Sequence, residues 1–494
     1  MIYVSQIYMG AAAILIVPAY IWMLGLEAFG IVSLYLVLNT WIGLLNFGLS
    51  STLSRAASRF RAGAIDSAQL RRLLGSIERI MLLVAIASAV AVAALAPWLV
   101  SHWLKLARLD PADAVIALRL TGLVIAVRFL GSPYRSILAG FEDLRWLGGF
   151  NILITTLRTL VVIPVMALAG AKLPVFFIWV LAVGIGETFY LAWRARLRSP
   201  RGGAGRGFAE LKGHWRYSIA LGLSAALWVI ATTADKAIIS GAVTLSTYAV
   251  FSVAIMAATA VEMVAQPVVL AFGPRLTFLY GAERTAEFNQ FYDSMTQLIA
   301  IFACSSAAFL CALASHVLFA WADNPAVTVF AAPVLAGYAA GNALLAIGAS
   351  PLQLQSATGR VGLHLAATIL FTFAVIAGLS LLVPTFGIRG AAWTWLAVNA
   401  AMFVFYVPIA HHRFYHGSHW SWLIRNVLPI ALAATVSGAL ARMFFPVGLG
   451  RIETVAALAV AGVAIFGVTA LSSSVARSQL RAVRERIAGK SRTA

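Results

Sequence analysis

Apolar runs long enough to cross a lipid bilayer recur along almost the whole chain. A spanning helix needs roughly 20 mostly apolar residues, and runs of that length predict about fourteen helices, with thirteen or twelve as alternatives. We expect an all-α polytopic membrane protein with spans at 2–24, 29–53, 76–100, 113–139, 146–168, 173–194, 217–241, 247–272, 291–318, 327–349, 361–384, 388–411, 422–445 and 452–473.

The composition agrees with a membrane protein and argues against a soluble one. Hydrophobic residues make up 62% of the chain and charged residues only 11%, whereas about 25% of residues are charged in an average globular protein. The 36 Lys and Arg exceed the 17 Asp and Glu. Because most of these cations lie in short segments between apolar runs, they indicate membrane topology and no nucleic-acid partner.

The distribution of Lys and Arg predicts the orientation. With a cytoplasmic N-terminus, the inward loops and the tail hold about 25 of them and the outward loops about 6. Residues 55–72, 194–216 and 477–492 contribute most of the inward charge. We therefore expect a multi-pass protein of the bacterial inner (plasma) membrane with both termini in the cytoplasm.

A segment rich in Gly, Arg and Pro, at 194–207, has the composition of a flexible linker. It divides the chain into a first lobe of six helices (1–200), a basic cytoplasmic linker (201–216), a second lobe (217–413), helices thirteen and fourteen (414–474) and a basic cytoplasmic tail (475–494). The longest loop holds about 22 residues, too few for a folded domain of roughly 50 residues. We also find no metal-ligand cluster, phosphate-binding loop or nucleophile triad, so we expect no cofactor and no enzyme activity.

Five short motifs resemble those of the polysaccharide and O-antigen flippases. They are LGLEAFG at 24–30, LNFGLS at 45–50 followed by Arg55, ADKAII at 234–239, LQSATGR at 354–360 and FGIRGAA at 386–392. These flippases belong to the multidrug, oligosaccharidyl-lipid and polysaccharide (MOP) exporter superfamily. At the level of spacing, the resemblance covers nearly the whole chain.

The resemblance implies two six-helix lobes in a V around a central cavity, plus two C-terminal helices. It implies that the chain flips a polyprenyl-pyrophosphate-linked oligosaccharide, such as an O-antigen or exopolysaccharide repeat unit, by alternating access. Membrane lipids, a polysaccharide polymerase and chain-length machinery are the further partners it implies.

Three alternatives stay open. A peptidoglycan-precursor flippase shares the fourteen helices and a cationic cavity. A MATE-type drug or cation exporter is disfavoured, because the first lobe carries three intramembrane Arg against one Glu. A membrane polysaccharide polymerase or ligase usually presents a long outward catalytic loop, and none is visible here.

Charged residues inside the predicted helices are the main candidates for a site. Each costs about 2.5–3.5 kcal/mol at mid-bilayer, so they must face a cavity or each other. They are Arg119, Arg128, Arg158, Glu187, Asp235, Lys236 and Glu262.

Two of these arginines lie at one depth. A rise of about 1.5 Å per residue places Arg128 and Arg158 roughly 16–18 Å from the cytoplasmic ends of their helices, and Glu262 at about 15 Å. One hypothesis is that both arginines hold a pyrophosphate or an acidic sugar, since a guanidinium matches phosphate geometry. The alternative is that one of them forms a structural ion pair with Glu262. Arg135, seven residues after Arg128, shares its face and would extend a cationic track.

The remaining candidates are less specific. Arg119 and Lys236, together with Asn39 and Asn46, are further cavity candidates, although the two asparagines also suit hydrogen bonding between helices.

Glu262, Asp235 and Glu187 are candidates for proton coupling or for ion pairs, and we expect a local structural role for Glu187. Since adjacent helical residues point about 100° apart, we expect that Asp235 and Lys236 do not pair with each other.

Overall fold

The computed structural model describes residues 2–46, 49–198 and 215–478, and these residues form helices joined by short loops, with a single isolated β-bridge. Eleven of its helices are long and apolar enough to cross a membrane, and the shorter apolar segment Tyr8–Leu24 adds to them. Two predicted spans, 361–384 and 388–411, lie within one long segment, Gly362–Phe414. The predicted span 217–241 is helix α11, which brings the total to about fourteen helices as expected.

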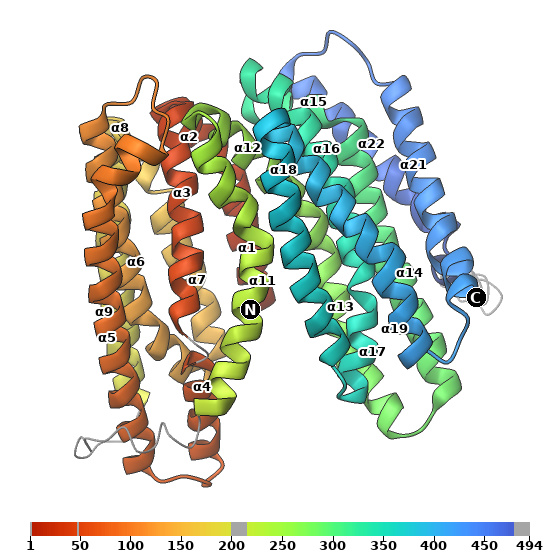
Figure 1. Cartoon of the computed structure of the whole chain (residues 1–494), viewed down its shortest axis with the longest axis horizontal. Coiled ribbons are helices and arrows are strands. Elements are labelled where there is room, and N and C mark those ends of the chain that lie inside the picture. Colours follow the sequence, from red (N-terminus) through yellow and green to blue (C-terminus); the bar gives the residue numbers. More distant parts are fainter. Residues whose placement is uncertain (1, 47–48, 199–214, 479–494) are drawn as a thin grey trace, which may run out of the picture. The chain divides into compact units, whose positions relative to one another are not determined.

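The chain forms two compact units, Met1–Ala249 and Val250–Ala494 (Figure 1). Most of the predicted linker and all but four residues of the predicted tail lie outside the described residues. The division at 201–216 therefore stays a prediction.

The first unit is a bundle in which every predicted span except 29–53 is present as one helix or as two consecutive helices. The elements are α1 (Ile2–Leu15), α2 (Val17–Leu24), α3 (Leu26–Gly43), η1 (Leu44–Asn46), α4 (Leu49–Arg61), α5 (Ser67–Trp98), η2 (Leu99–Trp103), α6 (Pro111–Gly140), α7 (Leu144–Thr159), α8 (Val162–Ala169), α9 (Leu173–Arg198) and α11 (Trp215–Ala242).

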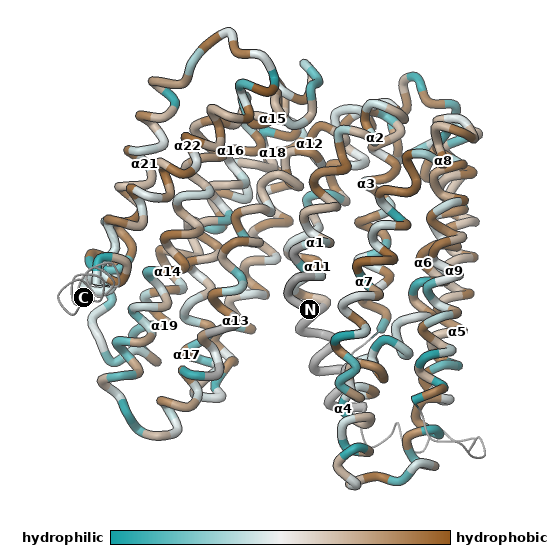
Figure 2. Tube along the Cα trace, turned by 180° about the vertical axis from the view of Figure 1, so that it is seen from behind, coloured by the Kyte–Doolittle hydropathy of each residue, from teal (hydrophilic) through white to brown (hydrophobic). Residues whose placement is uncertain are grey.

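One predicted span is divided differently. The expected helix 29–53 is in fact α3 followed by the 3₁₀ turn η1, and α4 is a separate helix. α4 carries Arg55, Arg59 and Arg61, and hydrophilic residues are visible along it in Figure 2. The mixed composition of α4 explains the difference, because a helix with one charged face is more stable at the membrane–water interface than in the apolar interior of the membrane.

α6 packs against α3, α4, α5, α7 and α9, and its longest contacts are with α5 and α9; these three helices lie together in Figure 1. Fully buried residues from α4, α5 and α6, including Leu53, Ile77 and Ile137, form the core between them. α4 approaches α6 at Gly140, where a Cβ atom would collide with the carbonyl oxygen of Ser54. A glycine is therefore required at this crossing. This packing fixes the rotation of α6, and with it the direction of its arginines.

The second unit is organised around α14, which contacts α13, α16, α21 and α22. α12 (Leu245–Ala258) runs from the end of the first unit into the second. The other elements are α13 (Ala260–Gly281), α14 (Thr285–Ala312), α15 (Ala314–Ala322), α16 (Pro325–Gly348), α17 (Ser350–Thr358), α18 (Gly362–Ala401), η3 (Met402–Tyr406), α19 (Val407–Phe414), α20 (His419–Trp422), η4 (Leu423–Val427), α21 (Leu428–Met443) and α22 (Arg451–Ser472).

Two features of the second unit follow from single residues. The break between two predicted spans falls at Gly387, whose φ of 55° and ψ of −136° interrupt α18, a conformation open mainly to glycine. Gln297 of α14 donates to Asn426 Oδ1 at 2.8 Å and accepts from Ser473 Oγ at 2.6 Å. One buried amide thereby joins α14 to η4 and to the end of α22.

Glu27 connects two turns of the first unit. Its carboxylate accepts hydrogen bonds from the backbone N–H groups of Ala107 (2.6 Å), Arg108 (2.8 Å) and Leu109 (3.1 Å). These donors lie just before α6 begins, so the carboxylate satisfies N–H groups that no helix would otherwise bond. The contact holds the α2–α3 turn against the segment that leads into α6.

We expect Glu27→Gln to lower the free energy of unfolding by about 0.5–1.5 kcal/mol, because an amide has no charge and cannot accept all three bonds, while water reaches the released donors. Thermal unfolding of the detergent-solubilised protein measures this loss. Glu283→Gln is the control, since Glu283 is an exposed carboxylate at another turn. Equal stability of the two variants would contradict a structural role for the Glu27 contact.

Candidate functional site

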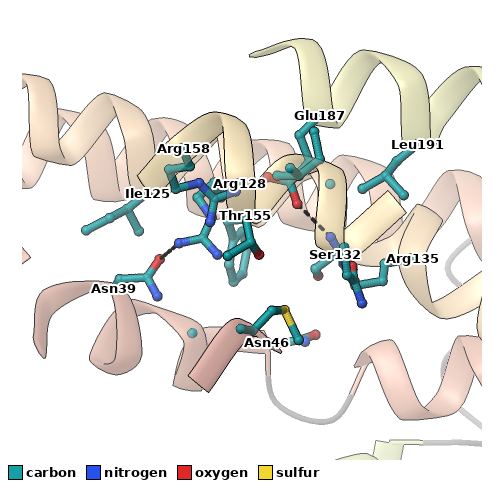
Figure 3. Close-up of a pocket in the computed structure, with 16 residues that line it drawn as sticks. Asn39, Asn46, Ile125, Arg128, Ser132, Arg135, Thr155, Arg158, Glu187 and Leu191 are labelled. Atoms are coloured by element: carbon teal, nitrogen blue, oxygen red, sulfur yellow. Dashed lines mark hydrogen bonds and ion pairs between the residues drawn. The ribbon is translucent and has the colours of Figure 1, made fainter. Parts of the chain in front are cut away.

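A cavity of about 370 Å³ lies inside the first unit, among α3, α6, α7 and α9. Figure 3 shows its lining. The charged and amide side chains that face it are Asn39, Asn46, Arg128, Arg135, Asn151, Arg158 and Glu187. The cavity therefore brings together four of the residues predicted as binding residues, namely Asn39, Asn46, Arg128 and Arg158, together with Glu187.

Arg128 is held by neutral groups of α3. Its Nη1 donates to Tyr35 Oη at 3.1 Å and to Asn39 Oδ1 at 3.2 Å. Tyr35 and Asn39 are four residues apart, so they project from one face of α3. They orient the guanidinium without neutralising its charge.

Glu187 of α9 binds two arginines at once. One carboxylate oxygen accepts from Arg158 Nη2, and the other accepts from Arg135 Nη2 at 2.6 Å. Arg135 also donates to Asn151 Oδ1. The residue Glu187 is only 6% exposed, so this carboxylate joins α6, α7 and α9 in surroundings where charge interactions are strong.

The cavity holds an excess of positive charge. Three arginines line it together with a single carboxylate, as Figure 3 shows. Within the described part of the chain, Arg158 Nε is buried and has no hydrogen-bond partner. Because buried donors and unbalanced charges are costly, this arrangement favours an anion between the arginines.

Asn46 also lines the cavity and forms hydrogen bonds with nearby residues. Its Nδ2 donates to Ser50 Oγ at 2.6 Å, and Ser50 Oγ is 3.2 Å from Ser132 Oγ. This chain of polar groups connects the end of η1 to α4 and α6. It agrees with the packing alternative considered for Asn46, while the side chain also faces the cavity.

Other predicted residues lie outside the cavity lining. Arg119 is exposed on α6, nine residues before Arg128, and Glu262 lies half-buried on α13 of the second unit. The carboxylate that pairs with Arg158 is Glu187, which the sequence analysis had assigned a local role. The coupling role considered for Glu262 stays a prediction.

The expectation that Asp235 and Lys236 do not pair is wrong. Lys236 Nζ lies 3.3 Å from Asp235 Oδ1 and donates to the carbonyl oxygen of Thr232 at 2.9 Å. The long lysine stem folds back along α11 and so overcomes the angle between adjacent residues. Both charges are thus accounted for within one helix, away from the cavity.

Tyr35, Asn151 and Thr155 face the cavity or hold its arginines, but the sequence analysis did not select them. A signal was present, since Asn151, Thr155 and Arg158 are spaced by four and three residues, as one face of a helix requires. Polar residues on that face of an apolar span indicate a shared polar environment.

We expect Glu187→Gln to lower the free energy of unfolding by about 1–3 kcal/mol, because it leaves two partly buried arginines without their carboxylate. Unfolding of the detergent-solubilised protein measures this, and adding Arg158→Met should recover part of the loss. Glu287→Gln, which breaks an exposed ion pair with Arg284, should cost at most about 1 kcal/mol. Equal losses in the Glu187 and Glu287 variants would contradict a buried, energetically coupled cluster.

The fold matches solved structures, although no protein-family model and no curated protein sequence matches the chain. A lipid II flippase, MurJ, in an inward closed conformation has a TM-score of 0.72 at 13% identity, covering 94% of this chain and 98% of its own. An inward-facing multidrug resistance MATE family transporter has a TM-score of 0.68 at 16% identity, with 82% and 94% covered.

A MOP superfamily transporter from Pyrococcus furiosus gives a TM-score of 0.58 at 15% identity, with 83% of this chain and 94% of its own chain covered. The binding pocket of that transporter is described as having reverse polarity. The chain therefore has the fold of MOP-superfamily transporters, a fold that includes a flippase and multidrug transporters.

Proposed function

We propose that this protein is a transporter that flips a polyprenyl-pyrophosphate-linked oligosaccharide from the cytoplasmic to the periplasmic leaflet of the bacterial inner membrane by alternating access. The observation that carries the proposal is the cluster of Arg128, Arg135 and Arg158 around one buried carboxylate. A pyrophosphate presents several oxygens that planar guanidinium groups bind well. The likeness in fold to MOP-superfamily transporters supports the same conclusion.

The charge of the cavity argues against a cationic substrate. A drug or cation exporter needs carboxylates that attract its substrate, and here the single carboxylate is already bound to two arginines. An incoming cation would meet a net positive site and lose its hydration. The MATE-type alternative is therefore the weaker one, despite the similar fold.

A peptidoglycan-precursor flippase is the second candidate. The specific observation in its favour is the similarity to a lipid II flippase over nearly the full length of both chains. An oligosaccharide repeat unit and a peptidoglycan precursor place the same pyrophosphate in the cavity and differ in the group attached to it. We favour the repeat unit on the motif resemblance, and with it a functional association with a polysaccharide polymerase and chain-length machinery.

The test is flipping of fluorescent polyprenyl-pyrophosphate oligosaccharides in liposomes that contain the protein, followed with a membrane-impermeant quencher. We expect Arg128→Ala and Arg158→Ala to slow flipping about tenfold to hundredfold, the scale of a lost charge-assisted hydrogen bond. The flipping rate of Arg158→Lys should lie between those of the native protein and Arg158→Ala, because lysine keeps the charge but lacks the planar guanidinium. Arg79→Ala, which removes an exposed arginine of α5 outside the cavity, is the control.

The outcomes separate the candidates. Flipping of the repeat unit that depends on both arginines supports the proposal. Flipping of a peptidoglycan precursor alone would replace it with the second candidate. Native rates in both alanine variants, with folding confirmed by size-exclusion chromatography, would make the arginines structural and overturn the assigned site.

A further inference from the structure

A second hollow, of about 530 Å³, runs between α7 and α9. We call it the α7–α9 groove. Of the eleven residues that line it, only Arg145 and Glu187 are charged, and the rest are apolar, aromatic or glycine. The groove is thus a largely hydrocarbon surface, unlike the neighbouring arginine cavity.

Stacked aromatic rings form a wall of the groove. Trp146 stacks on Phe150 with ring centroids 4.8 Å apart, and Tyr190 of α9 lies 5.7 Å from Trp146 and 5.4 Å from Phe150. Such a stack is stiff and apolar, and it gives a chain a preformed surface. Leu153, on the same helix as Trp146, is 53% exposed, so the groove is open to its surroundings.

The groove and the arginine cavity adjoin each other. Ile154 and Glu187 line both hollows, and Glu187 is the carboxylate that binds Arg158 and Arg135. An amphiphile can therefore place a charged group among the arginines and its chain along α7. The arrangement suits a lipid whose anionic group and hydrocarbon chain adjoin each other.

The length of the groove suits a membrane chain. From Arg145 to Leu157 the groove follows α7 for twelve residues, or about 18 Å at 1.5 Å per residue. Half of a hydrocarbon core of about 30 Å is about 15 Å. The groove is thus about as long as one leaflet of the hydrocarbon core is thick.

Two glycines keep the groove open. No heavy atom lies within 4 Å of the position that a Cβ would take at Gly149 or at Gly186. Neither glycine has the positive φ that would require it for the backbone. Replacing such a glycine with another residue would stabilise the helix, so helix stability does not explain the glycines. The absence of a side chain, which leaves the groove open, does explain them.

The charge of the cavity indicates which lipid fits. Three arginines against one glutamate leave an excess of two positive charges. A pyrophosphate joined to a lipid and a sugar carries two negative charges, whereas the phosphodiester of a common phospholipid carries one. The pyrophosphate balances the cavity, and in the substrate of the proposed function the chain attached to it is an isoprenoid.

We propose that the α7–α9 groove binds the isoprenoid chain of the carrier lipid while the pyrophosphate of the same molecule lies among Arg128, Arg135 and Arg158. The inference rests on the proposed function and adds to it a binding site for the lipid chain. In this arrangement the lipid chain passes between α7 and α9 and remains in the membrane, while the polar group is held inside the first unit.

The first test fills the groove. Gly149→Leu and Gly186→Leu place an apolar side chain in open space, and Gly467→Leu does the same on α22, away from the groove. We expect the two groove variants to flip a long-chain isoprenoid substrate about tenfold more slowly, as when a packed chain is displaced. Gly467→Leu should keep the native rate.

A short-chain substrate separates the two sites. Binding of the same glycan pyrophosphate on a short, water-soluble prenyl chain should be unchanged in the groove variants and lost in Arg158→Ala. Native flipping by both groove variants would overturn the groove and leave the proposed function standing. Failure of the native protein to flip any pyrophosphate-linked glycan would overturn the proposed function itself.

The second test identifies the occupant. A photoreactive amino acid at Leu153 should crosslink to the isoprenoid chain of the carrier lipid in liposomes, and excess unlabelled carrier should compete. Phe189 of α9 is 74% exposed but does not line the groove, and a probe there should crosslink much less carrier. Crosslinking at Leu153 to phospholipid that carrier does not displace would overturn the proposal.

Discussion

The sharing of one buried carboxylate by two arginines determines the character of the first unit. In an apolar bundle a lone guanidinium is unfavourable, and Glu187 compensates Arg158 and Arg135 together. Because the three residues come from α7, α6 and α9, the same contact that neutralises charge also sets the rotation of these helices. It leaves Arg128 with neutral hydrogen-bond partners, so the cavity keeps an excess of positive charge.

The packing of α6 supplies the geometry that this cluster needs. Close approaches to α4 at Gly140 and to α9 at Gly131 leave little freedom of rotation, and Thr188 Oγ1 of α9 donates to the carbonyl oxygen of Val127 at 2.8 Å. Arg128 follows directly after that bonded carbonyl. Its direction is therefore fixed from the backbone outward, and Tyr35 and Asn39 complete the arrangement from α3. A rigid scaffold of this kind favours the oriented binding of an anion.

The sequence predicted those features that depend on length and depth. Hydrophobic length located the helices, and a constant rise per residue placed Arg128 and Arg158 at one level, as the shared cavity requires. The rotation of each helix about its axis was harder to predict, because it depends on packing between helices that a single sequence does not reveal. For that reason Glu187 was not identified as the partner of Arg158, and Tyr35 was not selected. The Asp235–Lys236 pair was missed for a different reason, since it depends on the bending of one flexible side chain.

The single carboxylate among three arginines also has a consequence for transport. A site that carries its substrate must bind it strongly enough to admit it and weakly enough to release it. Three unopposed guanidinium groups would hold a dianion tightly, whereas Glu187 already occupies donors of Arg135 and Arg158 and so competes with any incoming phosphate. In the proposed mechanism this internal competition lowers the affinity without removing the selectivity for a double negative charge. In the same proposal, the apolar groove adds little to the affinity, because a lipid chain that moves from the membrane into an apolar groove removes no surface from water. Most of the binding free energy then comes from the polar group that must cross.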